Sequence, residues 1–380
     1  GRNGLGTVIV AGGGNDRVNG GNANYTNLTN TRTVTAVGAI NANTDLGALQ
    51  VGGTPFSNPG ANLLVRAPGS NIASTNRLQQ NENGSTFGAD STTVQGTSFA
   101  TPIVSGIVAL MLEANANLGY RDVQEILALS ARKVSDPDAT WQTNGSKGWN
   151  GGGMHVSHDY GYGEVDARAA VRLAETWINQ QTYSNERLLS TAPASGALAL
   201  AIPDGGASGV SHALAVSGAD LRAEYVEIRV SLTHARPGDL ILKLVSPSGT
   251  ESILMDRPGK KIGDATSAGD ATFNGSNTLD YVFSTARHRG EDPNGTWTIK
   301  VTDTATGATG TLNNWSFNVF GSGGTANDHY VYTNEYAQLA TVAGRNALND
   351  TDGGRDTINV AAVASASRID LTAGTGTVAG

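Results

Sequence analysis

The first half of the chain carries short runs of apolar and β-branched residues that are closed by turn residues. Such runs lie at residues 7–11, 33–38 and 63–69, and each leads into glycine or Pro-Gly. Continuous apolar runs of this length are typical of strands that are covered on both faces. They predict the buried strands of a parallel sheet.

Three longer segments place apolar residues at helical spacing. They cover about residues 98–116, a stretch that starts near residue 120, and about residues 165–177. In the second segment, Val123, Ile126 and Leu127 fall on one face of a helix. Together with the strands they predict an α/β unit over residues 1–182, in which helices pack on a parallel sheet.

The pattern changes near residue 183 to short segments of alternating polarity. These lie at residues 225–230, 240–245, 297–301 and 315–320, and clusters such as Ser-Pro-Ser-Gly and Asp-Pro-Asn-Gly separate them. Alternation with regular turns predicts an all-β sandwich over residues 183–321. Residues 322–380 form a third, polar segment that is rich in Asp and Gly.

The composition restricts the classes of partner. The chain of 380 residues has a formal net charge of −8, 50 glycines and no cysteine. Disulfides are therefore excluded, and the missing basic cluster argues against a nucleic acid partner. We predict no membrane span, because no apolar run reaches the roughly 18 residues that a bilayer requires. The longest run, near residues 102–112, is expected to form a buried helix.

Residues 96–102, Gly-Thr-Ser-Phe-Ala-Thr-Pro, carry the candidate chemistry. A serine hydroxyl is a weak nucleophile that needs an exposed position, a base and oxyanion donors. At the start of a helix, Ser98 would have backbone amides and the positive end of the helix dipole beside it. If Gly-Thr-Ser stood alone, Thr97 or Ser98 would be interpreted as an N-cap, with Pro102 early in the helix.

The whole serine segment, running on into residues 103–106, resembles the serine motif of the subtilisin family. Residues 8–15 resemble the strand of that family that ends in Gly-Asn. The resemblance implies that Ser98 is the nucleophile, that Asn15 donates a hydrogen bond to the oxyanion, and that the remaining motif positions are Gly96, Thr97 and Pro102. Without Ser98, Asn15 would be interpreted as a turn residue after a strand.

Longer segments resemble the kexin and furin branch of this family. They include residues 1–6, 112–124 and 156–163, while residues 237–250 and 291–315 contain stretches that resemble the P (homo B) domain. The resemblance implies a serine endopeptidase that acts on protein or peptide substrates. It also implies a partial subtilisin-like catalytic domain over residues 1–182, a jelly-roll-like P domain over residues 183–321, and structural calcium.

Two positions depart from this branch. Where the family has the Asp that selects basic residues, this chain has Ala23, and where it has an acidic calcium ligand beside Ser57, this chain has Asn58. We therefore expect a weakened attraction for basic side chains, so cleavage after paired basic residues is not predicted.

Two members of the catalytic triad are not found at their family positions. In the family an Asp and a His precede the serine, whereas all six histidines of this chain follow Ser98. They are His155, His158, His212, His234, His288 and His329. We expect the chain to be a fragment of an active endopeptidase, and to be inactive by itself.

The last segment resembles the start of the C-terminal region of serralysin-type secreted proteases, at residues 328–332 and 349–358. Carboxylates between glycines are suitable ligands for calcium, which makes Asp350, Asp352 and Asp356 candidates; a polar surface turn is the alternative interpretation. The resemblance implies an extracellular protein of a Gram-negative bacterium, exported by type I secretion.

Two other functions compete with the endopeptidase. The first is a non-catalytic secreted binding or adhesion module that keeps a degenerate protease remnant. The second is a metalloprotease, suggested by the tail alone. The sequence contains no His-Glu-x-x-His motif, which argues against the metalloprotease.

Overall fold

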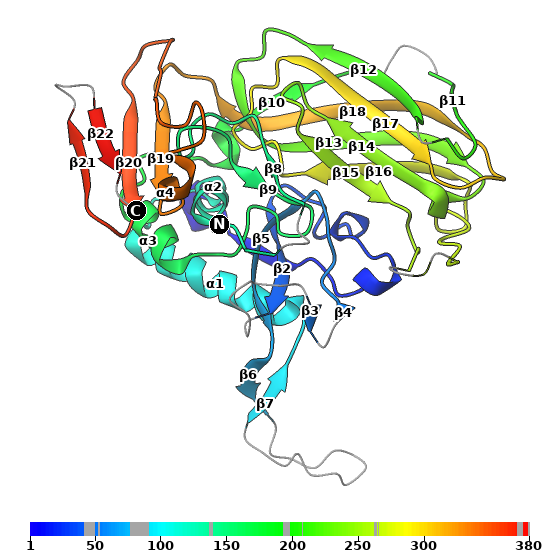
Figure 1. Cartoon of the computed structure of the whole chain (residues 1–380), viewed down its shortest axis with the longest axis horizontal. Coiled ribbons are helices and arrows are strands. Elements are labelled where there is room, and N and C mark those ends of the chain that lie inside the picture. Colours follow the sequence, from blue (N-terminus) through cyan, green and yellow to red (C-terminus); the bar gives the residue numbers. More distant parts are fainter. Residues whose placement is uncertain are drawn as a thin grey trace.

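The computed structural model describes residues 1–41, 50–51, 54–76, 91–136, 140–192, 198–206, 208–261, 264, 266–370 and 375–378. A parallel sheet of three strands lies at the centre of the first domain (Figure 1). Its order is β1 (Ile9–Gly12), β2 (Val34–Asn41) and β5 (Leu63–Ser70). All but the last residue of β2 are buried, as the continuous apolar run predicts.

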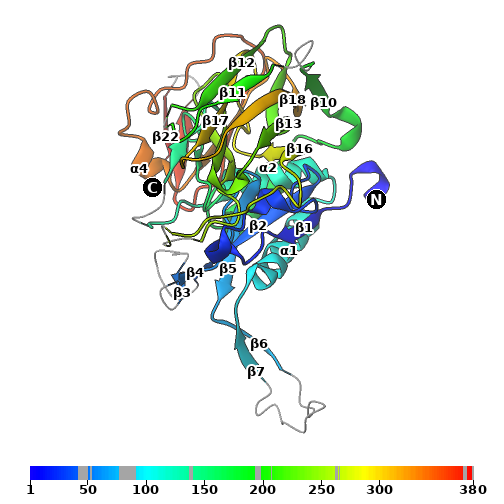
Figure 2. The same ribbon diagram turned by 90° about the vertical axis from the view of Figure 1, so that its right-hand side faces the viewer.

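Short antiparallel pairs accompany this sheet. β3 (Gln50–Val51) pairs with β4 (Thr54–Pro55), and β8 (Gln142–Thr143) pairs with β9 (His155–Val156). β6 (Ile72–Thr75) and β7 (Ser91–Val94) form a hairpin that projects from the domain between β5 and the serine segment (Figures 1 and 2).

Two helices pack on the sheet and a third packs on those two helices, which confirms the predicted α/β architecture. The helices are α1 (Thr97–Ala114), α2 (Tyr120–Ser130) and α3 (Ala167–Glu175). α1 contacts all three strands and α3, and its side chains Ala100, Val104 and Met111 are fully buried. The helix begins at Thr97, one residue before the predicted start, and it ends at Ala114.

One helix is long and apolar enough to cross a membrane, judged by length and composition alone. The prediction that no apolar segment reaches this length is therefore wrong. α1 has 18 residues and a mean hydropathy of 1.5, which is enough for a membrane-crossing helix on those two criteria. In the structure it packs on the sheet through Ala100, Val104, Ile107, Val108 and Met111. The same pattern therefore serves a core helix here, as predicted for residues 102–112.

The second domain is a sandwich of two antiparallel sheets. One sheet has the order β10 (Arg187–Ser190), β18 (Gly310–Gly323), β13 (Leu221–His234) and β16 (Thr278–Thr285), with β11 (Leu200–Ile202) also paired to β18. The other has the order β12 (Val210–Val216), β17 (Gly295–Asp303), β14 (Leu240–Val245) and β15 (Glu251–Asp256). Alternate residues point inward, and Trp297, Trp315 and Phe317 fill the space between the sheets.

Buried polar contacts hold the two domains together. The Arg121 guanidinium on α2 donates to the Glu224 carboxylate on β13, with a closest distance of 2.5 Å, and both side chains are nearly inaccessible. Arg289 pairs with Glu125 at 2.8 Å. The guanidinium groups of Arg121 and Arg289 therefore find their carboxylate partners only when the sandwich is docked on the first domain.

The last segment packs on the first domain. β19 (His329–Thr333) and β20 (Thr357–Ala362) form a parallel pair next to α3, followed by the antiparallel pair β21 (Ser367–Asp370) and β22 (Thr375–Val378) (Figure 1). The short helix α4 (Tyr336–Leu339) lies between β19 and β20 in sequence. Val331 and Ala362 belong to the core of the first domain, and the Val331 N–H donates to the Gly148 carbonyl at 2.8 Å.

Candidate active site

Ser98 lies exposed at the second residue of α1. The chain reaches it from the hairpin through Gly96, whose N–H donates to the Gly69 carbonyl at the end of β5 at 2.7 Å. Gly96 has φ +141°, a conformation that side chains other than hydrogen rarely adopt. The sheet edge and this glycine together set the position from which α1 begins.

Ser98 does not cap the helix. The N-cap residue is Gly96, and no side chain makes a capping hydrogen bond. Thr97 is buried, and its Oγ1 accepts from the Gly14 N–H at 3.3 Å instead. Pro102 lies inside α1 and has no N–H to donate to the carbonyl four residues earlier, which is that of Ser98. The N-cap interpretation of this segment is therefore wrong.

Asn15 lies beside this helix start, after the Gly12–Gly14 turn that follows β1. Its Oδ1 accepts from the Thr97 N–H at 2.9 Å, and its Nδ2 lies 3.6 Å from where a Cβ at Gly96 would be. A Cβ at Gly12 would come within 2.8 Å of Thr97 Oγ1, so the close approach requires glycine. Because Asn15 Oδ1 already accepts this hydrogen bond, the Nδ2 N–H groups of Asn15 remain as donors beside the start of α1.

Two residues hold the turn that carries Asn15, at residues 13–16. Sequence reasoning did not assign a supporting role to either of them. Asn58 accepts from the Asp16 N–H at 2.8 Å and donates to the Gly13 carbonyl at 3.1 Å. The buried Arg66 guanidinium donates to the Asn58 carbonyl at 3.0 Å and to Ser57 Oγ at 2.5 Å. Burial lowers the pKa of Arg66 to about 10, and nearby charges modify it less, so the side chain stays cationic at neutral pH.

The two departures from the family occupy buried positions. Ala23 is fully buried and clusters with Ala36 and Leu63. Asn58 is only 5% exposed and its amide is used by the Asn15 turn. Neither position provides a carboxylate for a basic substrate side chain.

None of the six histidines is bonded to Ser98 in the part of the chain that the structure describes. His158 accepts from the Ile253 N–H at 2.7 Å, and burial lowers its pKa well below the usual range. His234 pairs with Asp303, and His288 with Glu291. The other three contact Tyr162 and Glu335 (His155), Trp315 (His212) and Trp177 (His329).

The candidate calcium ligands lie at a different place. Asp350 and Asp352 come together with Asp328, with one ligand atom of each within 4.8 Å of the others. Asp356 instead accepts from the Asp328 N–H at 2.9 Å. Sequence reasoning missed Asp328 as a candidate ligand, because only the parallel pairing of β19 and β20 brings it beside the later turn.

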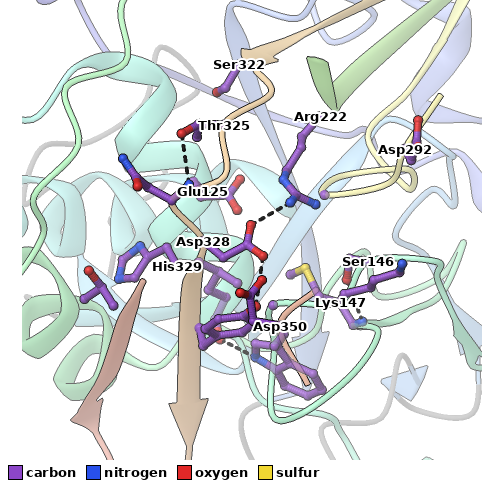
Figure 3. A pocket seen from close by; sticks show the side chains of 18 of the residues that line it. Glu125, Ser146, Lys147, Arg222, Asp292, Ser322, Thr325, Asp328, His329 and Asp350 are labelled. Atoms are coloured by element: carbon purple, nitrogen blue, oxygen red, sulfur yellow. Dashed lines mark hydrogen bonds and ion pairs between the residues drawn. The ribbon is translucent and has the colours of Figure 1, made fainter. Parts of the chain in front are cut away.

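These carboxylates line a cavity of about 1490 Å³ between the sandwich, the first domain and the tail. Figure 3 shows Asp328 and Asp350 close together, with Arg222 bonded to Asp328 at 2.6 Å. Tyr330 also donates to Asp328, whereas Asp350 accepts from the backbone N–H groups of Asp352 and Gly353. Three carboxylates suit a hard cation, although Arg222 already neutralises part of their charge.

Comparisons with known proteins agree with this arrangement. A model of the subtilase family matches residues 1–163, and a model of the proprotein convertase P-domain matches residues 223–319. The first domain is therefore similar to the subtilase family and the second to the P-domain of proprotein convertases, as the sequence predicts. The Ser98 and Asn15 segments both lie within the part that the subtilase model matches.

The curated relatives are considerably longer than this chain. Human furin is 33% identical over 232 residues, which cover 60% of this chain and 26% of furin. The "PC3-like endoprotease variant B" of Hydra vulgaris is 32% identical over 214 residues, covering 55% of this chain and 27% of the relative. The chain thus spans about a quarter of these curated relatives.

A solved structure shares the fold across both domains. The serine protease of Aeromonas sobria superposes with a TM-score of 0.67 at 23% identity, covering 84% of this chain and 65% of that chain. The predicted order of a subtilisin-like domain and a β-rich P domain is therefore confirmed.

Proposed function

We propose that Ser98 and Asn15 are the nucleophile and the oxyanion donor of a serine endopeptidase that hydrolyses protein or peptide substrates. The observation that carries this proposal is the hydrogen bond from the Thr97 N–H to Asn15 Oδ1. It fixes the carboxamide so that its N–H groups, and not its oxygen, are available beside the exposed serine. Gly96 is the N-cap residue of the same helix start.

The reaction follows from these positions. Ser98 Oγ attacks the carbonyl carbon of the scissile peptide, and the carbonyl oxygen becomes negatively charged. Asn15 Nδ2 and the amides of the first turn of α1 stabilise that charge, aided by the helix dipole. The Ser98 proton must move to a base and then to the leaving amine. Because the six histidines contact other groups, residues 1–380 alone do not turn over peptides.

The substrate preference differs from that implied by the branch. A carboxylate would attract a Lys or Arg side chain, but Ala23 and Asn58 stand at the positions where the resemblance places acids. The enzyme therefore does not favour paired basic residues.

Calcium binds at the tail. Asp328, Asp350 and Asp352 would hold the ion. The Asp356 carboxylate orients Asp328 by accepting from the Asp328 backbone N–H. The ion would tie the turn before β20 to β19, and it takes no part in the chemistry at Ser98.

The protein acts outside the cell. The serralysin-like tail and the resemblance to secreted proteases support a bacterial protein that leaves by type I secretion. Residues 1–182, 183–321 and 322–380 are the catalytic part, the P domain and the tail segment.

A fluorophosphonate probe tests the assignment of Ser98. In the active protein from its native host, we expect the label on Ser98, none in Ser98→Ala, and about 10²–10³-fold slower labelling in Asn15→Ala, the magnitude known for such a donor in a subtilisin. The purified chain of 380 residues should show no label above the Ser98→Ala background. Labelling of that chain at enzymatic rates would contradict the proposed lack of a base.

The positions of the histidines also favour one second candidate, a non-catalytic binding module. Such a module predicts that protein from the native host is unlabelled at Ser98 and that Ser98→Ala has no phenotype. The endopeptidase predicts the opposite result in both assays.

A further inference from the structure

A buried cation lies beside the turn that carries Asn15. The Arg66 side chain on β5 is fully buried, and its guanidinium donates to the Ala39 carbonyl at 2.8 Å and to the Asn58 carbonyl at 3.0 Å. It also donates to Ser57 Oγ. In the part of the chain that the structure describes, its hydrogen bonds go to these oxygens and not to a carboxylate. A charge buried in this way is costly, so packing alone does not account for it.

The fold leaves a slot for this guanidinium. Gly38 on β2 is the register partner of Arg66 in the parallel sheet. A Cβ built at Gly38 would come within 2.6 Å of Arg66 Cζ and 2.7 Å of Arg66 Nε, so any side chain there would displace the guanidinium. The centre of the Tyr160 ring lies 5.6 Å from Arg66 Cζ, a distance at which an aromatic face attracts a cation. The glycine and the ring therefore make room for the guanidinium and help to hold it.

The residue that accepts from Arg66 also holds the turn of Asn15 from both sides. Asn58 Oδ1 accepts from the Asp16 N–H at 2.8 Å, and Asn58 Nδ2 donates to the Gly13 carbonyl at 3.1 Å. Because Arg66 fixes the Asn58 backbone, it also fixes where the turn lies. An oxyanion donor stabilises the developing charge only when it is held in place before the reaction, so the position of this turn matters for catalysis.

We propose that Arg66 is a positioning residue for Asn15, and that its guanidinium is the fixed cation of this part of the site, where the resemblance implies a calcium ion. The inference rests on the proposed function, because Asn15 is an oxyanion donor only if Ser98 is the nucleophile. Arg66 acts on the reaction through Asn58.

The groups around Asn58 do not fit a calcium ion. Calcium takes six to eight oxygen ligands, commonly with carboxylates among them. Here the Asn58 carbonyl accepts from a guanidinium, and Asn58 Oδ1 accepts from the Asp16 N–H. A divalent ion would have to share these oxygens with the buried charge of Arg66, and two cations repel each other strongly in a buried place. The resemblance and the residues of this chain therefore disagree at this position.

The first experiment substitutes Arg66→Met, which removes the charge and the donors, with Arg287→Met as the matched control. Both arginines are fully buried, and burial lowers the pKa of each to about 10. Arg287 donates to the Glu251 carbonyl and to Gln142 Oε1, away from the Asn15 turn. Both variants should lower the thermal midpoint of the chain of 380 residues, because they leave buried acceptors unpaired.

The catalytic readout separates the two variants. In the active protein from its native host, Arg66→Met should slow fluorophosphonate labelling of folded Ser98 by about 10- to 100-fold, the effect of a small misplacement in an active site. Arg287→Met should leave the labelling rate unchanged. Equal labelling by both variants would overturn the inference.

A double-mutant cycle with Asn15→Ala tests whether Arg66 acts through Asn15. If it does, Arg66→Met should slow labelling by less than about 2-fold in the Asn15→Ala protein, because residues that act as a unit are not additive. A purely structural role would give the same factor in both backgrounds and would overturn the inference. If Arg66→Met does not fold, Arg66→Lys takes its place in the cycle with the same expected pattern, since it keeps the charge and loses the planar fork.

Asn58→Asp tests the claim about the cation. This variant keeps an acceptor for the Asp16 N–H, loses the donor to the Gly13 carbonyl, and adds the acid that the resemblance implies. Its labelling rate relative to the natural protein should be lowered equally in calcium and in a chelator. A rate that calcium restores to that of the natural protein would show that calcium, and not Arg66, serves this position.

The proposed function and this inference fail in different ways. If Ser98 is labelled and Arg66→Met slows labelling equally with and without Asn15, the positioning inference is wrong while the proposed function stands. If Ser98 is never labelled in protein from the native host, the proposed function is wrong, and the role of Arg66 falls with it.

Discussion

Replacing Glu291 by Gln should destabilise the sandwich in a pH-dependent way. The carboxylate is fully buried; its Oε1 accepts from the Gly145 N–H at 2.8 Å and from Thr250 Oγ1 at 2.5 Å. Its Oε2 lies 3.1 Å from His288 Nδ1. Burial raises the pKa of Glu291, but the charge and hydrogen bond of His288 and the other two donors outweigh it and hold the pKa at about 2.

The magnitude follows from the depressed pKa. A fall from 4.5 to about 2 corresponds to about 3 kcal/mol of stability. Because the folded pKa is the lower one, this stability is present above pH 4.5 and is lost as the pH falls from 4.5 towards 2. Glu291→Gln should therefore cost about 3 kcal/mol at pH 6, and the difference from the natural protein should vanish near pH 2.

Urea unfolding between pH 2 and pH 7 measures this difference. Glu251→Gln is the matched control, because Glu251 pairs with Lys243 at 3.1 Å in a partly exposed position, where an ion pair contributes about 0–1 kcal/mol. A Glu291→Gln penalty that stays constant with pH, or one no larger than that of Glu251→Gln, would refute the reasoning.

Three further predictions follow from the structure. Arg121→Ala leaves Glu224 buried without its partner, so urea unfolding should show a loss of about 3–5 kcal/mol, whereas Arg229→Ala, at an exposed pair, should cost much less. Gly96→Ala forces a side chain into φ +141°, so about 1–3 kcal/mol of backbone strain should lower the thermal midpoint; an unchanged midpoint would show that the helix start is not constrained. Asp350→Asn should abolish calcium binding in titration calorimetry, while Asp264→Asn should not; equal binding by both variants would remove the proposed site.

The parallel sheet and the three helices could be predicted because their signals are local. β2 is buried on both faces and is therefore continuously apolar, while α2 carries its apolar residues on one face. The serine segment predicts the start of α1 to within one residue. Ser98 and Asn15 could be named from short motifs, and the structure brings their segments together through Thr97.

The support of the site could not be predicted in the same way. Arg66 and Asn58 act through backbone carbonyls and N–H groups that lie together only in the folded chain. Asp328 likewise meets Asp350 only because β19 and β20 pair in parallel. The packing of the tail on the first domain, through Val331, depends on long-range contacts that carry no periodic signal.

A crystal structure of the active protein from its native host with a peptide boronic acid tests the central claim most directly. The account predicts a covalent bond from Ser98 Oγ to boron, with a boronate oxygen within hydrogen-bond distance of Asn15 Nδ2. A boronate attached to another residue, or one at Ser98 with the Asn15 amide turned away, would contradict it.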